Sequence, residues 1–371
     1  MNNEQLTVNK DQRKEKKGRQ YITCYLLFFF CSLFSVLCTC DIPQSNLPEQ
    51  HKYDPDLDGW RAASWSPFTV SDYITDITYG GGLYIAVSAT GIIAWSDDGD
   101  IWHKFRVTSD SIVREFHFNT VCYGDGVYIA AGNDGIFAYS NNGKDWIGSQ
   151  IGGFGVNEIC SVEYGAGFFV AVGDNSVICC SPDGVNWFGG PNSSFRDGNN
   201  NPISIKLNDI AFDSESGRFY VVANEGHRGW TINPVSGNWI HRGPEHPINN
   251  ANITKVAAGK YGEDIGIGIV YDRKTAIATN KDFIHFDADL ETFLFNGNAI
   301  NGIAWGGGYF VAGGTSAMIG YWHSGEPSRN SERYWRALTI PELRLWEITT
   351  LVACNGRFFA GNVGGKIIYS K

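Results

Sequence analysis

The 371-residue chain has 29 Lys and Arg residues against 39 Asp and Glu residues, and its net charge of −10 makes nucleic acid an unfavourable partner, because the protein would repel a phosphate backbone. Its 45 glycines, 23 phenylalanines, 17 tyrosines and 12 tryptophans, with only two methionines, favour many short strands joined by tight turns over long helices. The composition therefore predicts an all-β protein.

Residues 1–40 have the pattern of an export segment. Six Lys and Arg residues within the first twenty positions precede an uncharged apolar run from Tyr21 to Cys40, as in a signal peptide. The run is also long enough to cross a bilayer as a helix with its basic end in the cytoplasm, so an uncleaved anchor remains an alternative. In both cases the rest of the chain is expected to be extracytoplasmic and tethered to the cell envelope, at the cell surface or in the periplasm.

The end of this run, LCTC, resembles the lipobox of bacterial lipoproteins, in which a cysteine is lipidated and becomes the new N-terminus. The resemblance implies lipidation at Cys40, with Cys38 as the second choice, although Thr39 replaces the usual Gly, Ala or Ser. A plain signal peptide or membrane anchor that is rich in cysteine remains the alternative. Residues 41–55 are polar and free of periodicity, so we expect them to form a tether.

The exported part contains five cysteines, and their odd number and wide spacing argue against a disulfide scaffold. The cysteines are Cys122, Cys160, Cys179, Cys180 and Cys354. The adjacent pair could form a vicinal disulfide, but buried free thiols are the commoner outcome. No cofactor and no metal site is predicted. Residues 54–60, DPDLDGW, resemble the start of a calcium loop, but Trp65 stands where the twelfth-position Glu is needed.

One short phrase, S-x-(D/N)-G-x-x-W, recurs at residues 96–102, 140–146 and 181–187, and this period of about forty residues indicates a repeat fold. Aligning the segments before each phrase extends the repeat to seven copies, which share two columns of apolar residues. The first column is Ile74, Phe118, Ile159, Leu207, Ile253, Ile300 and Ile348, and the second is Ile77, Val121, Val162, Ile210, Val256, Ile303 and Leu351.

Each copy reads as four short strands, so residues 56–371 are predicted to form a seven-bladed β-propeller with four-stranded antiparallel blades. Two stacked sandwiches are the alternative architecture, but they do not predict seven copies. The seventh copy stops after its third strand, and residues 56–64 carry the D-G-W end of a phrase with no strands before it. We therefore expect this N-terminal strand to complete the last blade.

The recurring phrase resembles the Asp-box of sialidase-like, or BNR-type, repeats. The residue types predict a structural turn, in which the Asp or Asn side chain accepts backbone N–H groups, Gly has a positive φ, and Trp is buried between blades. We expect no catalytic role for Asp98, Asn142 or Asp183.

Resemblance to sialidases would imply a glycoside hydrolase that holds its substrate with three arginines, the first in an (F/Y)-R-I-P motif, and reacts through a Tyr–Glu pair and an Asp. The chain contains no R-I-P, and Arg61 lies in GWRAAS on the predicted closing strand. No catalytic residues are therefore assigned. The preferred interpretation is a non-catalytic, monomeric binding or scaffold protein for a protein or carbohydrate ligand, with a sialidase-like glycoside hydrolase as the alternative.

Propeller ligands usually bind at the upper mouth of the axial channel, where the loops from fourth to first strands and from second to third strands meet. One position before the first apolar column stands a ring of mixed polarity: Tyr73, His117, Glu158, Lys206, Asn252, Ala299 and Glu347. The second-to-third loops contribute Asp134, Asp174, Glu225, His227, Arg228, Arg273 and Lys274. The ligand-binding candidates are Tyr73, His117, Glu158, Lys206, Glu225, His227, Arg228, Arg273 and Glu347; ordinary solvated loop residues are the alternative interpretation.

Overall fold

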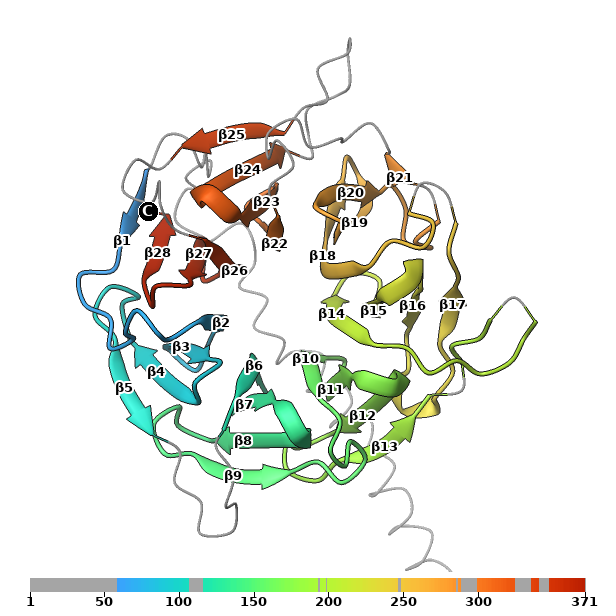
Figure 1. Cartoon of the computed structure of the whole chain (residues 1–371), viewed down its shortest axis with the longest axis horizontal. Coiled ribbons are helices and arrows are strands. Elements are labelled where there is room, and N and C mark those ends of the chain that lie inside the picture. Colours follow the sequence, from blue (N-terminus) through green and yellow to red (C-terminus); the bar gives the residue numbers. More distant parts are fainter. Residues whose placement is uncertain are drawn as a thin grey trace, which may run out of the picture. The chain divides into compact units, whose positions relative to one another are not determined.

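The computed structural model describes residues 59–106, 116–192, 194–197, 199–245, 248–284, 286–287, 299–323, 335–339 and 347–370. These residues belong to one compact unit that spans residues 54–371. Seven four-stranded antiparallel sheets surround a common axis, each with its first strand nearest the axis (Figure 1). The predicted all-β, seven-bladed propeller is confirmed. The predicted signal segment, Cys40 and the tether lie outside the described residues.

Each blade runs in chain order from its inner strand to its outer strand. The strands are β2 (Ile74–Gly80), β3 (Leu83–Ser88), β4 (Ile92–Ser96) and β5 (His103–Arg106) in blade one; β6 (Phe118–Gly124), β7 (Val127–Gly132), β8 (Ile136–Ser140) and β9 (Ile147–Gln150) in blade two; β10 (Ile159–Gly165), β11 (Phe168–Gly173), β12 (Val177–Ser181) and β13 (Phe188–Pro191) in blade three; and β14 (Leu207–Asp213), β15 (Arg218–Ala223), β16 (Arg228–Thr231) and β17 (Ile240–Arg242) in blade four.

Blades five to seven follow the same order, except that blade seven takes its outer strand from the N-terminal side. Their strands are β18 (Ile253–Tyr261), β19 (Asp264–Tyr271), β20 (Lys274–Ala278) and β21 (Phe286–Asp287); β22 (Ile300–Gly306), β23 (Tyr309–Gly314), β24 (Met318–His323) and β25 (Arg336–Thr339); and β26 (Ile348–Cys354), β27 (Arg357–Asn362), β28 (Ile367–Ser370) and β1 (Trp60–Ala62). Within the described part of the chain, no helix is long and apolar enough to cross a membrane.

The N-terminal strand closes the ring, as the sequence predicted. Strand β1 pairs antiparallel with β28 and sets Trp60 opposite Ser370 (Figure 1). The Ala63 N–H extends this pairing by donating to the Ile367 carbonyl at 2.9 Å. Because β1 occupies the outer edge of β28, the last blade has the same four strands as the other six.

A bulge in every inner strand explains the spacing of the two apolar columns. All fourteen column residues are buried, with exposed fractions of at most 6%. Positions three apart on a regular strand would face opposite sides of the sheet, as Ile74 and Ile77 would on β2. The register of all seven inner strands shifts between the first column and the position two residues later, so both columns reach the core.

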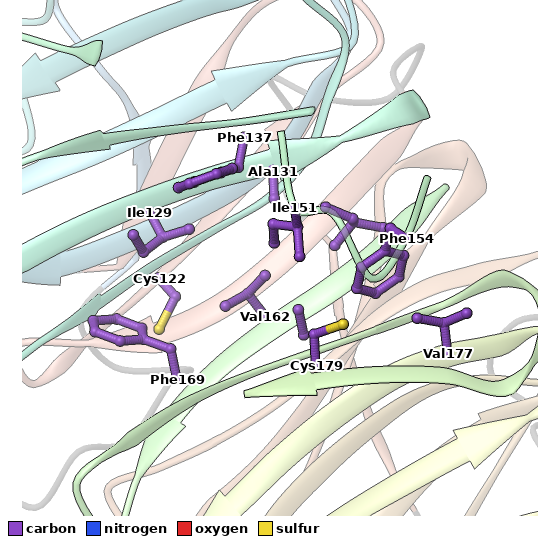
Figure 2. Packing of buried hydrophobic residues seen from close by; sticks show 12 residues of the cluster. Cys122, Ile129, Ala131, Phe137, Ile151, Phe154, Val162, Phe169, Val177 and Cys179 are labelled. Atoms are coloured by element: carbon purple, nitrogen blue, oxygen red, sulfur yellow. The ribbon is translucent and has the colours of Figure 1, made fainter. Parts of the chain in front are cut away.

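The core lies between neighbouring blades. Figure 2 shows the cluster between blades two and three, where Ile129 and Phe137 of blade two face Val162 and Phe169 of blade three. Such face-to-face packing of apolar side chains is the main source of stability in stacked sheets. Cys179 lies in the same cluster, and burial raises the pKa of its thiol to about 12. It is a free thiol, as is Cys180, so the vicinal disulfide is not formed.

The three repeated phrases form turns with the predicted hydrogen bonds. Asp98 Oδ1 accepts the backbone N–H groups of Asp100 at 2.8 Å and of Ile101 at 3.0 Å, and Gly99 has a φ of 79°. The indole Nε1 of Trp102 donates to the Gly99 carbonyl at 3.0 Å. The equivalent bonds recur around Asn142 and Asp183. These side chains serve the turn itself.

The tryptophans of these turns are not equally buried. Trp102 is fully buried against blade seven and Trp146 is 3% exposed against blade one. Trp187 packs against Phe137 of blade two, with ring centroids 5.9 Å apart, but it is only half-buried. The expectation that each of these tryptophans is buried between blades is confirmed for Trp102 and Trp146 and only in part for Trp187.

Candidate functional site

The two sets of loops that were predicted to form the upper face lie next to each other in every blade. The carbonyl of each ring residue accepts a backbone N–H from the turn between the second and third strands of its own blade, at 2.9–3.4 Å. The donors are Ala89, Asn133, Asp174, Asn224, Asp272, Thr315 and Val363, and the acceptors are Tyr73, His117, Glu158, Lys206, Asn252, Ala299 and Glu347. This repeated bond fixes the height of the ring and leaves its side chains free to vary.

The upper turns bend sharply, and glycine is needed where the two loops meet most closely. A Cβ on Gly132 would lie 1.7 Å from the His117 carbonyl oxygen. The turns also hold non-glycine residues in the left-handed region, including Glu225 with a φ of 57° and Arg273 with a φ of 68°. This conformation costs about 1 kcal/mol or more for such side chains and directs them away from the turn.

Glu158, Lys206 and Asp174 form a charged group on blades three and four. The Lys206 ammonium donates to Glu158 Oε2 and lies 3.8 Å from Asp174 Oδ1. Asn119 of blade two donates to Glu158 Oε1 at 2.9 Å. Burial opposes the charge of Lys206, but the Glu158 hydrogen bond and the neighbouring negative charges outweigh it and raise its pKa.

Cys160 lies beside this group. Its sulfur and the carboxylate oxygens of Glu158 and Asp174 are within 4.8 Å of one another, close enough to share a metal ion. Burial raises the pKa of the Cys160 thiol to about 12, which disfavours the thiolate that a metal would need. The Lys206 ammonium already pairs with the Glu158 carboxylate and lies near that of Asp174, so it balances one of their two negative charges. The group is therefore an ion-paired cluster on the upper face.

A pocket of about 530 Å³ spans blades five to seven on the upper face. Asn252, Asp272, Arg273, Asn301 and Glu347 line it, so both charge signs and two amides face one cavity. The Asn301 side-chain amide donates to Glu347 Oε1 at 3.1 Å, which orients that carboxylate. The structure thus brings together Arg273 and Glu347 of the predicted site, and Asn252 of the predicted ring.

The predicted candidates Tyr73, His117 and Glu225 are exposed but do not line this pocket. The His117 imidazole Nδ1 donates to the Ala89 carbonyl of blade one, which holds its ring at the loop junction. The Glu225 backbone N–H donates to Asn252 Oδ1 at 3.2 Å, and its carboxylate side chain is exposed. The upper face therefore offers two groups of side chains, with single exposed residues between them.

His227 and Arg228 do not belong to this surface, which corrects the sequence prediction. Arg228 is fully buried, and its guanidinium donates to the carbonyls of Phe283 and Gly243 and to the Glu245 carboxylate. His227 is 7% exposed. When the third strands are aligned at their last residues, the position of His227 holds Ile, Ile and Val in blades one to three. The position of Arg228 holds Ile, Phe and Ile in the same blades. The apolar residues at these positions in the other blades were the sequence signal that His227 and Arg228 are buried.

Sequence reasoning missed the axial channel, a cavity of about 460 Å³ lined by the inner strands. Asp76, Asp209 and Lys255 occupy the position just before the second apolar column, and Glu163 the position just after it. The signal was the run of polar residues between two apolar columns. The bulge of each inner strand lets the residue before the second column lie beside the channel while both column residues reach the core.

Burial raises the pKa of two acidic groups of this channel, and the neighbouring carboxylates raise the pKa of its lysine. It raises the pKa of Asp76 to about 6, even though Lys255 and the N–H groups of Val121 and Ile77 favour the carboxylate. Burial also raises the pKa of Glu163 to about 8, and the negative charges of Asp209 and Asp76 add to this effect. Asp209, followed by Asp76, raises the pKa of Lys255 against the effect of burial.

Comparison with known proteins supports the fold and goes no further. No family model matches the sequence, and no curated protein matches it. Among solved structures, a YCF48 protein bound to a D1 peptide superposes with a TM-score of 0.63 at 13% identity, covering 86% of this chain and 97% of that one. The WD40 propeller domain of Doa1 superposes with a TM-score of 0.59 at 15% identity, covering 85% of this chain and 97% of that one. YCF48 from Cyanidioschyzon merolae superposes with a TM-score of 0.59 at 15% identity, covering 84% of this chain and 98% of that one. At these identities the likeness concerns the propeller alone.

Proposed function

We propose that this propeller is a non-catalytic binding protein that recognises a polypeptide segment on its upper face. The observation that carries the proposal is the pocket across blades five to seven, where Arg273, Glu347 and the Asn252 and Asn301 amides face one cavity. Side chains of both charges and amides suit a peptide, whose backbone and side chains offer donors, acceptors and charges together. The similarly folded YCF48 was solved with a peptide bound, which agrees with this use of the fold.

The glycoside hydrolase alternative receives less support from the arginines. Recognition of a sialic acid carboxylate would require several guanidinium groups in one pocket. Arg273 is the single arginine among the described residues that line the upper pocket, and Arg228 is committed to Phe283, Gly243 and Glu245 inside the blade wall. A glycan bound without catalysis remains the second candidate ligand. Its support is the same set of amides and carboxylates.

The proposal places the propeller outside the cytoplasm as a monomer, tethered to the bacterial envelope through a lipid on Cys40. Its basis is the basic and apolar N-terminal pattern and the polar segment that follows Cys40. Mass spectrometry of the mature protein tests it. A mature chain that begins at a diacylated Cys40 is expected, and a chain that begins at Met1 or at another residue would refute the lipid anchor.

Binding is tested with the intact chain as bait in a solubilised envelope extract, with captured proteins quantified by mass spectrometry. Recovery of a specific partner should fall at least about tenfold for Arg273→Ala and for Glu347→Ala, because each removes a charged contact worth about 1.4 kcal/mol or more. Lys104→Ala, on the exposed face of the outer strand β5, is the control and should bind as the unmodified chain does.

Two outcomes would overturn the assignment to a polypeptide. Equal partner recovery with all variants would show that the upper pocket is not the binding site. A glycan-array signal that Arg273→Ala abolishes, with no captured protein affected, would replace the polypeptide by a carbohydrate.

A further inference from the structure

The carboxylates of the axial channel link neighbouring blades. Asp76 of blade one accepts the Thr120 hydroxyl at 3.1 Å and the Val121 N–H at 2.9 Å, both from blade two. Asp209 of blade four accepts the Val256 N–H of blade five at 3.0 Å. Inner strands of adjacent blades do not pair as a sheet, so these bonds satisfy backbone donors that face the channel. The charge state of the channel is therefore coupled to contacts between blades.

Glu163 departs from the pattern of its own position. The equivalent residues of the other six inner strands are small or apolar, namely Thr78, Cys122, Ala211, Ala257, Ala304 and Val352. Glu163 puts a carboxyl group into the cavity that Asp76, Asp209 and Lys255 also line. With all four groups ionised, three carboxylates would share one ammonium in about 460 Å³. Carboxylates that share one cavity repel one another, so this arrangement favours a proton on one of them.

Titratable groups from most of the inner strands line the same cavity as Glu163. They are Asp76 and Tyr79 on β2, Cys122 and Tyr123 on β6, Cys160 on β10, Asp209 on β14, Lys255 on β18 and Cys354 on β26. Burial keeps the thiols of Cys122, Cys160 and Cys354 protonated, because it raises the pKa of each. The charge balance near neutral pH therefore depends on Glu163 and Asp76.

We propose that the axial channel is a proton-responsive lock of the ring, in which a proton held on Glu163 of blade three limits the negative charge beside Asp76 and Asp209, whose hydrogen bonds join blade one to two and blade four to five. Loss of this proton adds a third negative charge beside Asp76 and Asp209 and weakens the contacts between blades. The device is independent of any ligand on the upper face. It makes the ring more stable in mildly acidic than in alkaline surroundings.

The direction follows from proton linkage. A carboxyl group whose pKa is higher in the folded chain than in the unfolded chain binds a proton on folding. The pKa of Glu163 rises from 4.5 to about 8, and the pKa of Asp76 from 3.8 to about 6. The stabilising effect of both protons is complete when the pH is below the pKa values of the unfolded chain. It is lost as the pH rises through the pKa values of the folded chain. Between pH 6.5 and 9, the loss of stability comes from the ionisation of Glu163.

The test is thermal unfolding of the full-length chain at pH 6.5, 7.5 and 9, compared with Glu163→Gln. The melting temperature of the unmodified chain should fall as the pH rises through this range. Glu163→Gln cannot ionise, so it should lose most of this fall and melt higher than the unmodified chain at pH 9, with a folding equilibrium constant at least about tenfold larger. Glu263→Gln, on the exposed β18–β19 turn, is the matched control and should keep the full pH dependence.

A spectroscopic measurement keeps the proposal falsifiable if Glu163→Gln unfolds. Infrared difference spectra of the unmodified chain between pH 7 and 9 should show the loss of a protonated carboxyl band, and Asp76→Asn should retain that band. Absence of the band, or an unchanged pH dependence of melting in Glu163→Gln, would overturn the proposal.

Discussion

The Thr349 hydroxyl of blade seven donates to the Ile74 carbonyl of blade one and closes the inside of the ring. The same position supports other blade junctions, where a side chain just after the first apolar column donates to the column carbonyl of the next blade. These donors are Thr75, Asn119, Asn208 and Asn301, at 2.8–3.0 Å. The ring is therefore closed twice, at the axis by Thr349 and at the rim by β1 on β28.

Removing the inner closure should destabilise the propeller. Thr349→Val keeps the shape of the side chain but leaves the carbonyl of the buried Ile74 without this donor, which should lower the free energy of unfolding by about 1–3 kcal/mol. Thr254→Val is the matched control, because Thr254 is exposed and donates at 3.4 Å to a carbonyl of its own blade. Its expected effect is below about 0.5 kcal/mol. Equal losses in denaturant unfolding would contradict a special role for the junction.

The outer closure has its own test. Ala63→Pro removes the N–H that donates to Ile367, a residue that is 1% exposed, and should cost about 1–3 kcal/mol and promote aggregation through the opened edge of β28. Ala63→Ser retains the N–H and should remain monomeric. Thermal melts and light scattering of both variants decide the matter. A monomeric Ala63→Pro protein of normal stability would show that the N-terminal strand is dispensable.

The tryptophans of the repeated turns should differ in their contribution to the free energy of unfolding. Trp102→Ala and Trp146→Ala each remove a buried indole and should lower the free energy of unfolding by about 3–5 kcal/mol. The half-buried Trp187 should cost less, about 1–3 kcal/mol. Trp65 is 63% exposed and serves as the control, with an expected loss below about 0.5 kcal/mol. Equal losses for Trp102 and Trp187 in urea unfolding would contradict this order.

The repeat made the architecture readable from the sequence, because the same physical requirement is written seven times. Column residues such as Ile74 and Ile77 must be apolar in every blade, and the missing strand of blade seven left Trp60 as the obvious replacement. Positions that depart from the repeat were harder to place. Arg228 is polar, yet it occupies a core position because carbonyls and Glu245 of its own neighbourhood satisfy it.

The upper pocket and the channel were only partly readable for a related reason. The ring register placed Glu347 and the second-to-third loop placed Arg273 on the same face, but their sharing of a pocket with Asn301 depends on the angles between blades. The bulges that turn Asp76 and Asp209 into the channel have no local sequence marker, since any residue can occupy them.

Two imidazoles next to Arg228, the buried one of His227 and the partly buried one of His241, should make the chain sensitive to acid. His227 Nδ1 lies 2.8 Å from His241 Nε2, and the rings stack at 5.0 Å with an angle of 13° between them. The Arg196 N–H points to His241 Nδ1 at 3.5 Å, so the proton of this ring belongs on Nε2 and is donated to His227. A second proton on either ring would have to enter a hydrogen bond that already contains a proton.

Burial, followed by the positive charges around it, lowers the pKa of His241 from 6.5 to about 4, and burial also lowers the pKa of His227. The unfolded chain therefore binds these protons first, so the stabilising effect is complete above pH 6.5 and is lost as the pH falls toward 4. The loss should amount to about 1–3 kcal/mol. His241→Phe retains a flat ring against His227 and Phe195 but cannot be charged, so it should flatten the fall in melting temperature between pH 6.5 and 4. His103→Gln, which removes an exposed imidazole on β5, should melt with the same acid dependence as the unmodified chain. If both variants kept the full acid dependence, another group would be responsible for it.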